Sequence, residues 1–205
     1  DIEKDTLNIN FDSLESKITK KTKVIMLVHV LGLSTNMNKI KSLVKKHNLI
    51  LIEDTCESLG TKYNNKFLGS FGDFGTYSFY YSHQITSGEG GMVVCNNSED
   101  YNLLLSLRSH GWSRGLKIKN SKFRKYKFVD KKFMFINSGF NLRPTEIQAA
   151  IGLNQFKRKN IFKNNRSKNR LNIIKALKKD VRWKNQLVFI SENKKTKPSW
   201  FGMPI

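Results

Sequence analysis

Val-Ile-Met-Leu-Val-His-Val-Leu at residues 24–31 and Leu-Ile-Leu-Ile-Glu-Asp at residues 49–54 frame the segment that decides the fold. Both begin as short apolar runs rich in branched side chains, which is typical of strands buried in a parallel sheet. Between them Gly32 breaks the first run, and apolar residues recur at helical spacing from Met37 to His47, with Asn36 as a candidate N-cap. Strand, helix and strand in succession predict a βαβ unit, and hence an α/β protein with a parallel sheet buried on both faces.

The rest of the chain continues with further strands and helices. Strands are predicted over residues 76–81 and 92–95, and helices over residues 98–111, 144–156 and 160–179. Ser98 is the predicted cap of the first of these helices. Residues 113–135 are basic and lack periodicity, which favours a long exposed loop or hairpin. The final residues, from Trp200 to Ile205, are interpreted as the entry to another strand.

The composition is strongly basic. Lys and Arg number 37 against 16 Asp and Glu, which gives a formal net charge of +21 and makes nucleic-acid binding the first hypothesis to test. The cations are mainly lysines scattered along the chain, whereas dedicated nucleic-acid surfaces combine arginine clusters with aromatic residues. A solvated surface is therefore the simpler interpretation, and most of the basic residues in the helices and in residues 113–135 are expected to face solvent.

The number of cysteines and the length of the apolar runs indicate the cellular compartment of the protein. Two cysteines, Cys56 and Cys95, cannot form a disulfide framework. No apolar run approaches the roughly 20 residues that span a bilayer. We therefore expect a cytoplasmic protein with no membrane partner and no specific nucleic-acid partner.

The segment from Glu53 to Gly60 is the first of three that suggest chemistry. Asp54 ends a predicted buried strand, and ligands of parallel sheets bind at the carboxyl ends of strands. A carboxylate there can hold a protonated ring nitrogen, as pyridoxal phosphate enzymes require. A helix N-cap is an equally good interpretation of these residues.

The other two segments combine hydroxyl groups, glycines and polar donors. Tyr77 to Gly91 contains Ser78, which can donate to a phosphate, and His83, a residue type suited to proton transfer near neutral pH. Gly139 to Glu146 places polar donors just before a predicted helix, where an anion can bind. A structural histidine and ordinary helix capping are the alternatives for these two segments.

Taken together and in this order, the segments resemble the DegT/DnrJ/EryC1/StrS family of nucleotide-sugar aminotransferases and dehydratases. The resemblance covers nearly the whole chain, through Glu53-Asp54 with Gly60, Gly69–Asp73, Ser78-Phe79, Gly88–Gly91, Arg108–Gly111 and Gly139–Arg143. It implies a type I pyridoxal-phosphate transferase fold, similar to aspartate aminotransferase, with a mostly parallel sheet and helices on both faces. Residues 1–180 are then the large cofactor-binding domain without its N-terminal part, and residues 181–205 begin a truncated small C-terminal domain.

The resemblance also implies roles for individual residues. Asp54 would pair with the pyridine nitrogen of the cofactor, and Ser78 would bind its phosphate. Glu57 stands beside the cofactor ring, where most members have glutamine. Asn141 would reach the cofactor phosphate of the neighbouring subunit, which implies a homodimer.

One departure from the family pattern decides the implied reaction. Family aminotransferases carry a lysine where this chain has His83, and an imidazole cannot form the covalent Schiff base with pyridoxal phosphate. It can still take and return a proton. The segment resembles the 3-dehydratase branch, which removes the C3 hydroxyl of nucleotide-linked 4-keto-6-deoxy sugars in surface-polysaccharide and lipopolysaccharide O-antigen biosynthesis. That branch uses pyridoxal or pyridoxamine phosphate with glutamate as amino donor. An aminotransferase-like member with another substrate is the alternative.

Some members of this branch also carry an iron–sulfur cluster on four cysteines. Cys56 fits the first position, but Arg114, Leu116 and Arg124 occupy the other three, so no iron–sulfur cluster and no other metal is expected. His110 and Arg114 belong to a further matching segment, and their basic side chains would suit a nucleotide diphosphate sugar.

Overall fold

The computed structural model describes residues 1–116, 128–184, 186–190 and 192–205. The chain divides into two compact units, one of residues 1–94 with 146–205 and the other of residues 95–145. The division into large and small domains at residue 180 stays a prediction.

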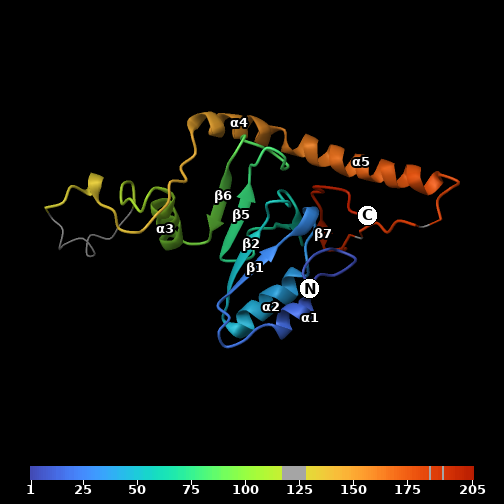
Figure 1. The fold of residues 1–205 in the computed structure, drawn as a ribbon, viewed down its shortest axis with the longest axis horizontal. Coiled ribbons are helices and arrows are strands. Elements are labelled where there is room, and N and C mark those ends of the chain that lie inside the picture. Colours follow the sequence, from blue (N-terminus) through green and yellow to red (C-terminus); the bar gives the residue numbers. More distant parts are fainter. Residues whose placement is uncertain (117–127, 185, 191) are drawn as a thin grey trace. The chain divides into compact units, whose positions relative to one another are not determined.

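The first unit is built on a four-stranded sheet (Figure 1). Its order is β1-β2-β5-β6, with bounds β1 Val24–Val28, β2 Ile50–Asp54, β5 Phe74–Ser78 and β6 Gly91–Cys95. β1 is parallel to β2, and β2 is parallel to β5. The arrow of β6 runs opposite to that of β5 in Figure 1. These pairings confirm the predicted α/β class with a mostly parallel sheet.

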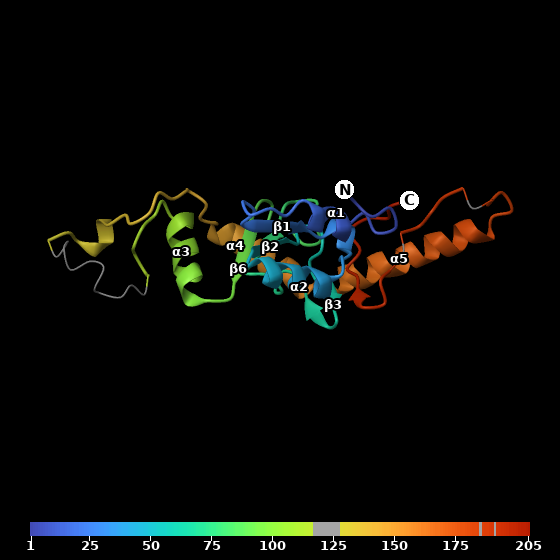
Figure 2. The same cartoon turned by 90° about the horizontal axis from the view of Figure 1, so that it is seen from below.

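Helix α2, Met37–His47, completes the predicted βαβ unit. Asn36 caps it as expected, because its side chain accepts a hydrogen bond from the Lys39 amide. Figure 2 shows α2 running alongside β1 and β2. Its buried face packs on the inward side chains of the sheet, and this core comprises Ile25, Leu27, Met37, Ile40, Leu43, Leu49, Leu51, Tyr63 and Leu68. Each fully buried aliphatic side chain contributes about 1.5–3 kcal/mol, so this layer is the main stabilising part of the unit.

The short helix α1, Phe11–Ser16, extends the same layer. The Asn10 side chain caps it by accepting from the Ser13 amide, and Phe11 and Leu14 pack against the core. The sheet is therefore covered on the side that carries α2.

The opposite face of the sheet is open among the described residues. Val24, Met26, Val28 and Ile50 are 43–59% exposed, and they alternate along β1 and β2 with buried residues. The prediction of a sheet buried on both faces is therefore wrong for the described part of the chain. The continuous apolar run suggested two buried faces, whereas the structure covers one.

The first strand is shorter than the sequence predicts. β1 ends at Val28, and residues Val30–Gly32 form the 3₁₀ turn η1 with Leu31 in the left-handed region at φ 54°. The chain turns here because His29 is fully buried against β2, with its amide donating to the Asp54 carbonyl at 2.9 Å. Apolar residues in such a partly buried turn cannot be distinguished from a strand by pattern.

Other boundaries also shift. The strand predicted over residues 76–81 is β5, Phe74–Ser78, and helix α3 spans Ser98–Arg108 rather than reaching residue 111. The predicted cap Ser98 is wrong, because the Asn97 side chain accepts the Asp100 amide and caps α3.

Helices α4, Glu146–Lys157, and α5, Lys159–Lys179, confirm the two helices predicted near the C-terminal part, with α4 starting after Pro144 rather than at it. Both pass across the carboxyl ends of the parallel strands in Figure 1. No described helix is both long enough and apolar enough to cross a membrane.

A second small sheet, also in the first unit, pairs the C-terminal segment with residues that follow β2. Its order is β4-β3-β7, with bounds β3 Lys62–Tyr63, β4 Lys66–Phe67 and β7 Thr196–Lys197. The strand expected at residues 200–205 is wrong, since the pairing residues lie before it. Trp200 is buried instead, in a cluster with Leu33 and Ile190.

The second unit contains α3, the turn η3 at Lys131–Phe133, and the β-bridges Ser109–Asn141 and Trp112–Phe135. The predicted loop or hairpin at 113–135 lies partly outside the described residues, since 117–127 are not described. At its described ends the Ser113 amide and hydroxyl both donate to the Met134 carbonyl at 2.9 Å, so the two ends lie side by side.

Candidate cofactor site

Asp54 lies at the carboxyl end of β2, in register with Val28 of β1 and Thr76 of β5. Residues in register on parallel strands share a face and successive residues alternate, so Asp54, Thr76 and Ser78 point to the same side. This is the open face of the sheet. The Asp54 Oδ1 accepts the Cys56 amide at 3.0 Å, and residues 55–61 form turns rather than a helix. The helix N-cap interpretation of Asp54 is therefore wrong.

Ser78 ends β5 beside a loop of residues 79–90. Its Oγ accepts the Tyr80 amide at 3.1 Å, and a hydroxyl that accepts one hydrogen bond can still donate its own proton to a phosphate. The loop is closed by two backbone bonds, from the Phe79 amide to the Gly90 carbonyl at 2.8 Å and from the Ser87 amide to the Phe79 carbonyl at 3.0 Å. The loop therefore returns to the strand end with Ser78 at its base.

His83 lies within this loop and is held by aromatic rings. Its imidazole centroid is 5.6 Å from the ring of Tyr80 and 5.4 Å from the ring of Phe201, both in edge-to-face geometry. Its Nδ1 is buried and has no hydrogen-bond partner among the described residues. The ring is therefore oriented by packing, and its Nδ1 is not held by a described protein group.

A closed series of contacts joins His83 to the strand ends. The Phe201 amide donates to the Leu31 carbonyl at 3.2 Å, and the Leu31 amide donates to Glu57 Oε2 at 2.9 Å. The Gln84 side-chain amide donates to the Glu57 carbonyl. Gln84 directly follows His83, so this bond closes the series. Glu57 thus lies between the turn after β1 and the loop that carries His83.

Sequence reasoning missed the participation of Phe201 and Leu31. Phe201 reaches the site from the C-terminal segment, and Leu31 participates through its backbone. The sequence pattern indicates neither contact. Leu31 acts through its backbone amide and carbonyl, which every residue has except for the amide of proline, and the packing of Phe201 on His83 is a long-range contact that leaves no periodicity in the sequence.

The neighbouring carboxylate, Glu53, points to the buried face and is 0% exposed. It accepts from His29 Nε2 at 3.0 Å and from the amides of Gly69 at 2.9 Å, Phe71 at 2.6 Å and Gly72 at 2.7 Å. Burial alone would raise the pKa of Glu53, but these donors outweigh it and lower the pKa. Glu53 therefore anchors the turn before β5 to the end of β2. The sequence could have indicated this role, because Glu53 is a charged residue at an inward-facing position of an otherwise apolar strand.

Cys56, which matches the first cluster position of the iron–sulfur relatives, is a free thiol beside Thr76. Burial and the adjacent Asp54 carboxylate raise its pKa to about 11, so the thiol is protonated at neutral pH. No group of three or more His, Cys, Asp or Glu residues is placed to hold a metal ion in the described part of the chain.

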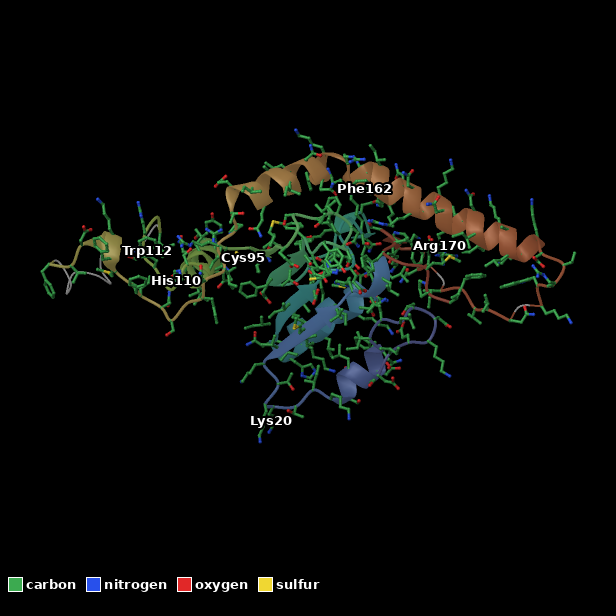
Figure 3. All side chains as sticks on the ribbon, turned by 45° about the horizontal axis from the view of Figure 1, so that its top comes forward. Lys20, Cys95, His110, Trp112, Phe162 and Arg170 are labelled. Atoms are coloured by element: carbon green, nitrogen blue, oxygen red, sulfur yellow. The ribbon has the colours of Figure 1, made fainter. Side chains whose placement is uncertain are left out.

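The remaining predicted residues belong to the second unit. Asn141 bridges to Ser109, and the His110 amide donates to the Phe140 carbonyl at 2.7 Å with His110 at φ 61°. The guanidinium of Arg114 lies 5.3 Å from the centroid of the Trp112 ring, in cation–π geometry. All three predicted residues are exposed. Figure 3 labels His110 and Trp112 on this unit.

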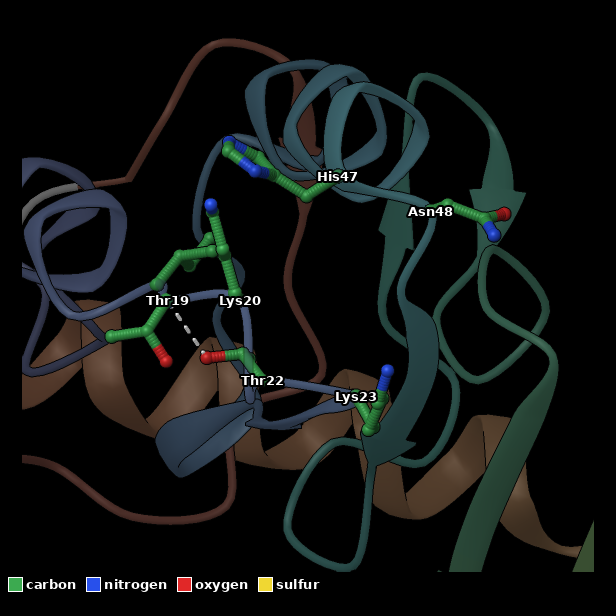
Figure 4. Close-up of a pocket in the computed structure, with 7 residues that line it drawn as sticks. Thr19, Lys20, Thr22, Lys23, His47 and Asn48 are labelled. Atoms are coloured by element: carbon green, nitrogen blue, oxygen red, sulfur yellow. Dashed lines mark hydrogen bonds between the residues drawn. The ribbon is translucent and has the colours of Figure 1, made fainter.

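A separate cavity of about 540 Å³ lies at the amino-terminal edge of the sheet (Figure 4). Its lining comes from the residues just before β1 and β2, namely Ile18, Thr19, Lys20, Thr22, Lys23, His47 and Asn48. None of the predicted site residues lines it, and it lies at the opposite end of the strands from Asp54.

The fold and the site define a class of α/β protein in which a carboxylate, a hydroxyl and an imidazole gather at the carboxyl ends of parallel strands, where ligands of such sheets bind. The sequence matches a family over residues 1–205, and the chain belongs to this DegT/DnrJ/EryC1/StrS aminotransferase family. The structure also confirms the predicted fold, because it superposes on solved members that share more than 30% of its sequence.

The chain is similar to GDP-4-keto-6-deoxy-D-mannose 3-dehydratase of Escherichia coli O55:H7 (strain CB9615 / EPEC), with 41% identity over 82% of this chain and 44% of the relative. It is similar in structure to an asparagine-for-histidine mutant of GDP-4-keto-6-deoxymannose-3-dehydratase with bound GDP-perosamine, with a TM-score of 0.85, 37% identity, and coverage of 99% of this chain and 52% of that one. A second structure of that enzyme, with a trapped PLP-glutamate geminal diamine, gives a TM-score of 0.81 and 34% identity over 99% of this chain and 52% of that one. The chain thus spans about half the length of these relatives.

Proposed function

We propose that the protein containing this chain removes the C3 hydroxyl of a nucleotide-linked 4-keto-6-deoxy sugar, with pyridoxal or pyridoxamine 5'-phosphate as cofactor and glutamate as amino donor. The observation that carries the proposal is His83, an imidazole at the position where family aminotransferases have lysine, held beside the strand-end residues. The names of the similar proteins support the same reaction.

The residues at the strand ends fit the cofactor. Asp54 presents a partly exposed carboxylate from the end of a parallel strand, and Ser78 presents a hydroxyl on the same face. Asp54 would hold the ring nitrogen protonated, Ser78 would donate to the phosphate, and Glu57 would lie beside the ring. When bound, the cofactor supplies an electron sink that allows a hydroxyl group to leave from carbon.

His83 would act as the acid and base of the reaction. An imidazole is suited to take a proton and return it near neutral pH. The rings of Tyr80 and Phe201 pack against it edge to face, and its Nδ1 forms no hydrogen bond to a described residue that would compete with a substrate.

Substrate and partner contacts complete the proposal. Exposed Arg114 and His110 would contact the diphosphate of the nucleotide sugar. Asn141 would reach the cofactor of a second subunit in a homodimer. The reaction would take place in the cytoplasm, in surface-polysaccharide sugar biosynthesis, with no specific nucleic-acid partner.

An aminotransferase-like activity on another sugar is the second candidate, and the aminotransferase description of the matched family favours it. The two reactions differ in product, since dehydration yields a 3-deoxy ketone whereas transamination yields an amino sugar.

The test uses the full-length protein with cofactor, glutamate and GDP-, CDP- or dTDP-linked 4-keto-6-deoxy sugars, and the products are identified by mass spectrometry. We expect a 3-deoxy product from the wild type and none from His83→Asn. His47→Asn, on the exposed end of α2, is the matched control and should retain activity. An amino sugar as the main product would favour the second candidate.

A trapping experiment tests the role of His83 separately. Borohydride treatment should attach no cofactor to the wild-type protein, whereas His83→Lys should gain a covalently trapped cofactor. Trapping on a lysine of the wild type would contradict the lysine-free site.

A further inference from the structure

We propose that one face of helix α5 positions His83, through three cations that hold the site-forming segments by their backbone carbonyls. These are Lys163, Arg166 and Arg170, here called the α5 inner stripe. The inference rests on the proposed function, and it gives a role to part of the basic helix that the sequence assigned to solvent.

The stripe follows helical geometry. Residues three and four apart lie on one face of a helix, and Lys163, Arg166 and Arg170 have this spacing. Lys163 Nζ donates to the Gly60 carbonyl at 3.2 Å, Arg166 Nη2 to the Gln84 carbonyl at 3.1 Å, and Arg170 Nη2 to the Ile190 carbonyl at 2.8 Å. The Arg170 guanidinium also lies 3.9 Å from the centroid of the Trp200 ring. Figure 3 labels Arg170 on α5, beside the C-terminal segment.

Two of the three hydrogen bonds fall on segments that build the site, and Arg170 contacts the C-terminal segment at Ile190 and Trp200. Gly60 ends the segment that begins with Glu53-Asp54, and Gln84 follows His83 directly. Trp200 precedes Phe201, whose ring packs on His83. One helix thus contacts the strand-end turn, the His83 loop and Trp200, the sequence neighbour of the residue whose ring packs on the imidazole.

Arg166 is the central member because it acts on the peptide next to His83. The same residue, Gln84, donates its side-chain amide to the Glu57 carbonyl, so its backbone and side chain are both held. A guanidinium is a planar, rigid donor group, so it fixes the direction of the carbonyl as well as its distance. The loop beside His83 is therefore held from α5 on one side and from Glu57 on the other.

Arg170 is buried and Lys163 and Arg166 are partly buried, which distinguishes these cations from a fully solvated face. Desolvation lowers the pKa of Lys163, Arg166 and Arg170. No ion pair within 4.0 Å joins any of the three to a carboxylate among the residues that the structure describes. Charged side chains are costly to bury, and here their donors are directed to carbonyls around one site.

The decisive variant is Arg166→Met in the full-length protein, which keeps much of the side-chain volume but removes the donor to Gln84. We expect kcat of the dehydration to fall by about 10- to 100-fold, since displacement of a reacting group by about 1 Å costs about 100-fold. KM and the melting temperature should change little. The matched control is Lys168→Met, an exposed lysine on the same helix, which should behave as wild type.

Arg166→Lys provides the conservative variant, and it remains informative if Arg166→Met fails to fold. It keeps the positive charge but loses the planar fork, so its kcat should lie between those of Arg166→Met and wild type. A kcat equal to wild type in both variants would overturn the proposal. A loss of activity that only follows the folded fraction would also overturn it, because a merely structural role predicts that result.

A spectroscopic measurement separates this inference from the proposed reaction. In protein labelled with ¹³C-histidine, the His83 signal is identified by its loss in His83→Asn. Arg166→Met should shift or broaden that signal, and Lys168→Met should leave it unchanged. If the wild type catalyses no dehydration but the His83 signal moves, the proposed function fails and the positioning role stands. If dehydration occurs and neither kcat nor the His83 signal responds, the positioning role fails alone.

Discussion

Glu53 and Asp54 are adjacent in the sequence but belong to opposite faces of the sheet, and the two faces behave differently. On the covered face, Glu53 is fully buried and accepts hydrogen bonds from His29 and from three backbone amides. On the open face, Asp54 is partly exposed and accepts one from the Cys56 amide. The alternation of side chains along a strand separates them, although their chemistry is nearly the same.

The difference shows how one motif combines support and chemistry. Glu53 joins the end of β2 to the turn before β5 and is saturated with donors, so it has little capacity for a ligand. Asp54 retains capacity to accept from a bound group. The covered face therefore stabilises the strand ends, and the open face presents the polar groups of the candidate site.

The largest expected effect follows from replacing the buried carboxylate. Glu53→Gln leaves several buried donors without a charged acceptor and should lower the free energy of unfolding by about 3–5 kcal/mol. Denaturant unfolding of the full-length protein followed by circular dichroism measures this. Glu15→Gln, which breaks an exposed pair with Lys46, is the control and should cost at most about 1 kcal/mol. An equal decrease in the free energy of unfolding in the two variants would contradict the conclusion that Glu53 on the covered face stabilises the strand ends.

A smaller loss is expected at Gly32, where the backbone has φ 89° and an added Cβ would collide with the Ser199 carbonyl. Gly32→Ala should cost about 1–3 kcal/mol through this strain. It should also displace Phe201, because the Ser199 amide donates to the Gly32 carbonyl and the Phe201 amide donates to that of Leu31. Calorimetric melting measures the stability, and kcat measures the displacement. Gly88→Ala, also at positive φ but with nothing within 4 Å of its added Cβ, is the matched comparison, and an equal loss there would argue against the collision.

Acid should weaken the covered face through Glu53. The pKa of Glu53 is lowered by folding from its ordinary value of 4.5, so the unfolded chain binds more protons as the pH falls below that value. The stability from this group is present above about pH 4.5 and declines below it, by at most about 1.4 kcal/mol per pH unit for one proton. Unfolding measured between pH 3 and 6 should show this slope in the wild type and a shallower one in Glu53→Gln. Equal slopes would exclude Glu53 as its source.

The smallest effect on stability is expected from Asp54→Asn. The asparagine carbonyl can still accept the Cys56 amide, so the free energy of unfolding should change by no more than about 0.5 kcal/mol without cofactor. The proposed dehydratase activity should nevertheless be lost, because an amide cannot hold a ring nitrogen protonated as a carboxylate does. A loss of stability comparable to that of Glu53→Gln would show that the two faces do not differ as described.

The sequence by itself determined the α/β class, the βαβ unit, the later strands β5 and β6, the helices α3 to α5, the Asn36 cap and the family. These features depend on local periodicity, capping chemistry and the order of motifs, all of which can be read directly from the sequence. It also identified Asp54 and His83 as candidate site residues, because their motif context and strand-end position are visible without coordinates.

The tertiary structure decided which groups meet. The open face of β1 and β2, the turn at His29 and the partnership of His29 with Glu53 depend on long-range packing that an apolar run does not specify. The same is true of Phe201, which contacts His83 from the C-terminal segment, and of the α5 inner stripe. The residue type alone does not tell whether a lysine or arginine is buried or solvated. The carbonyl that each cation of the stripe contacts is far from it in the sequence and comes close to it only when the chain folds.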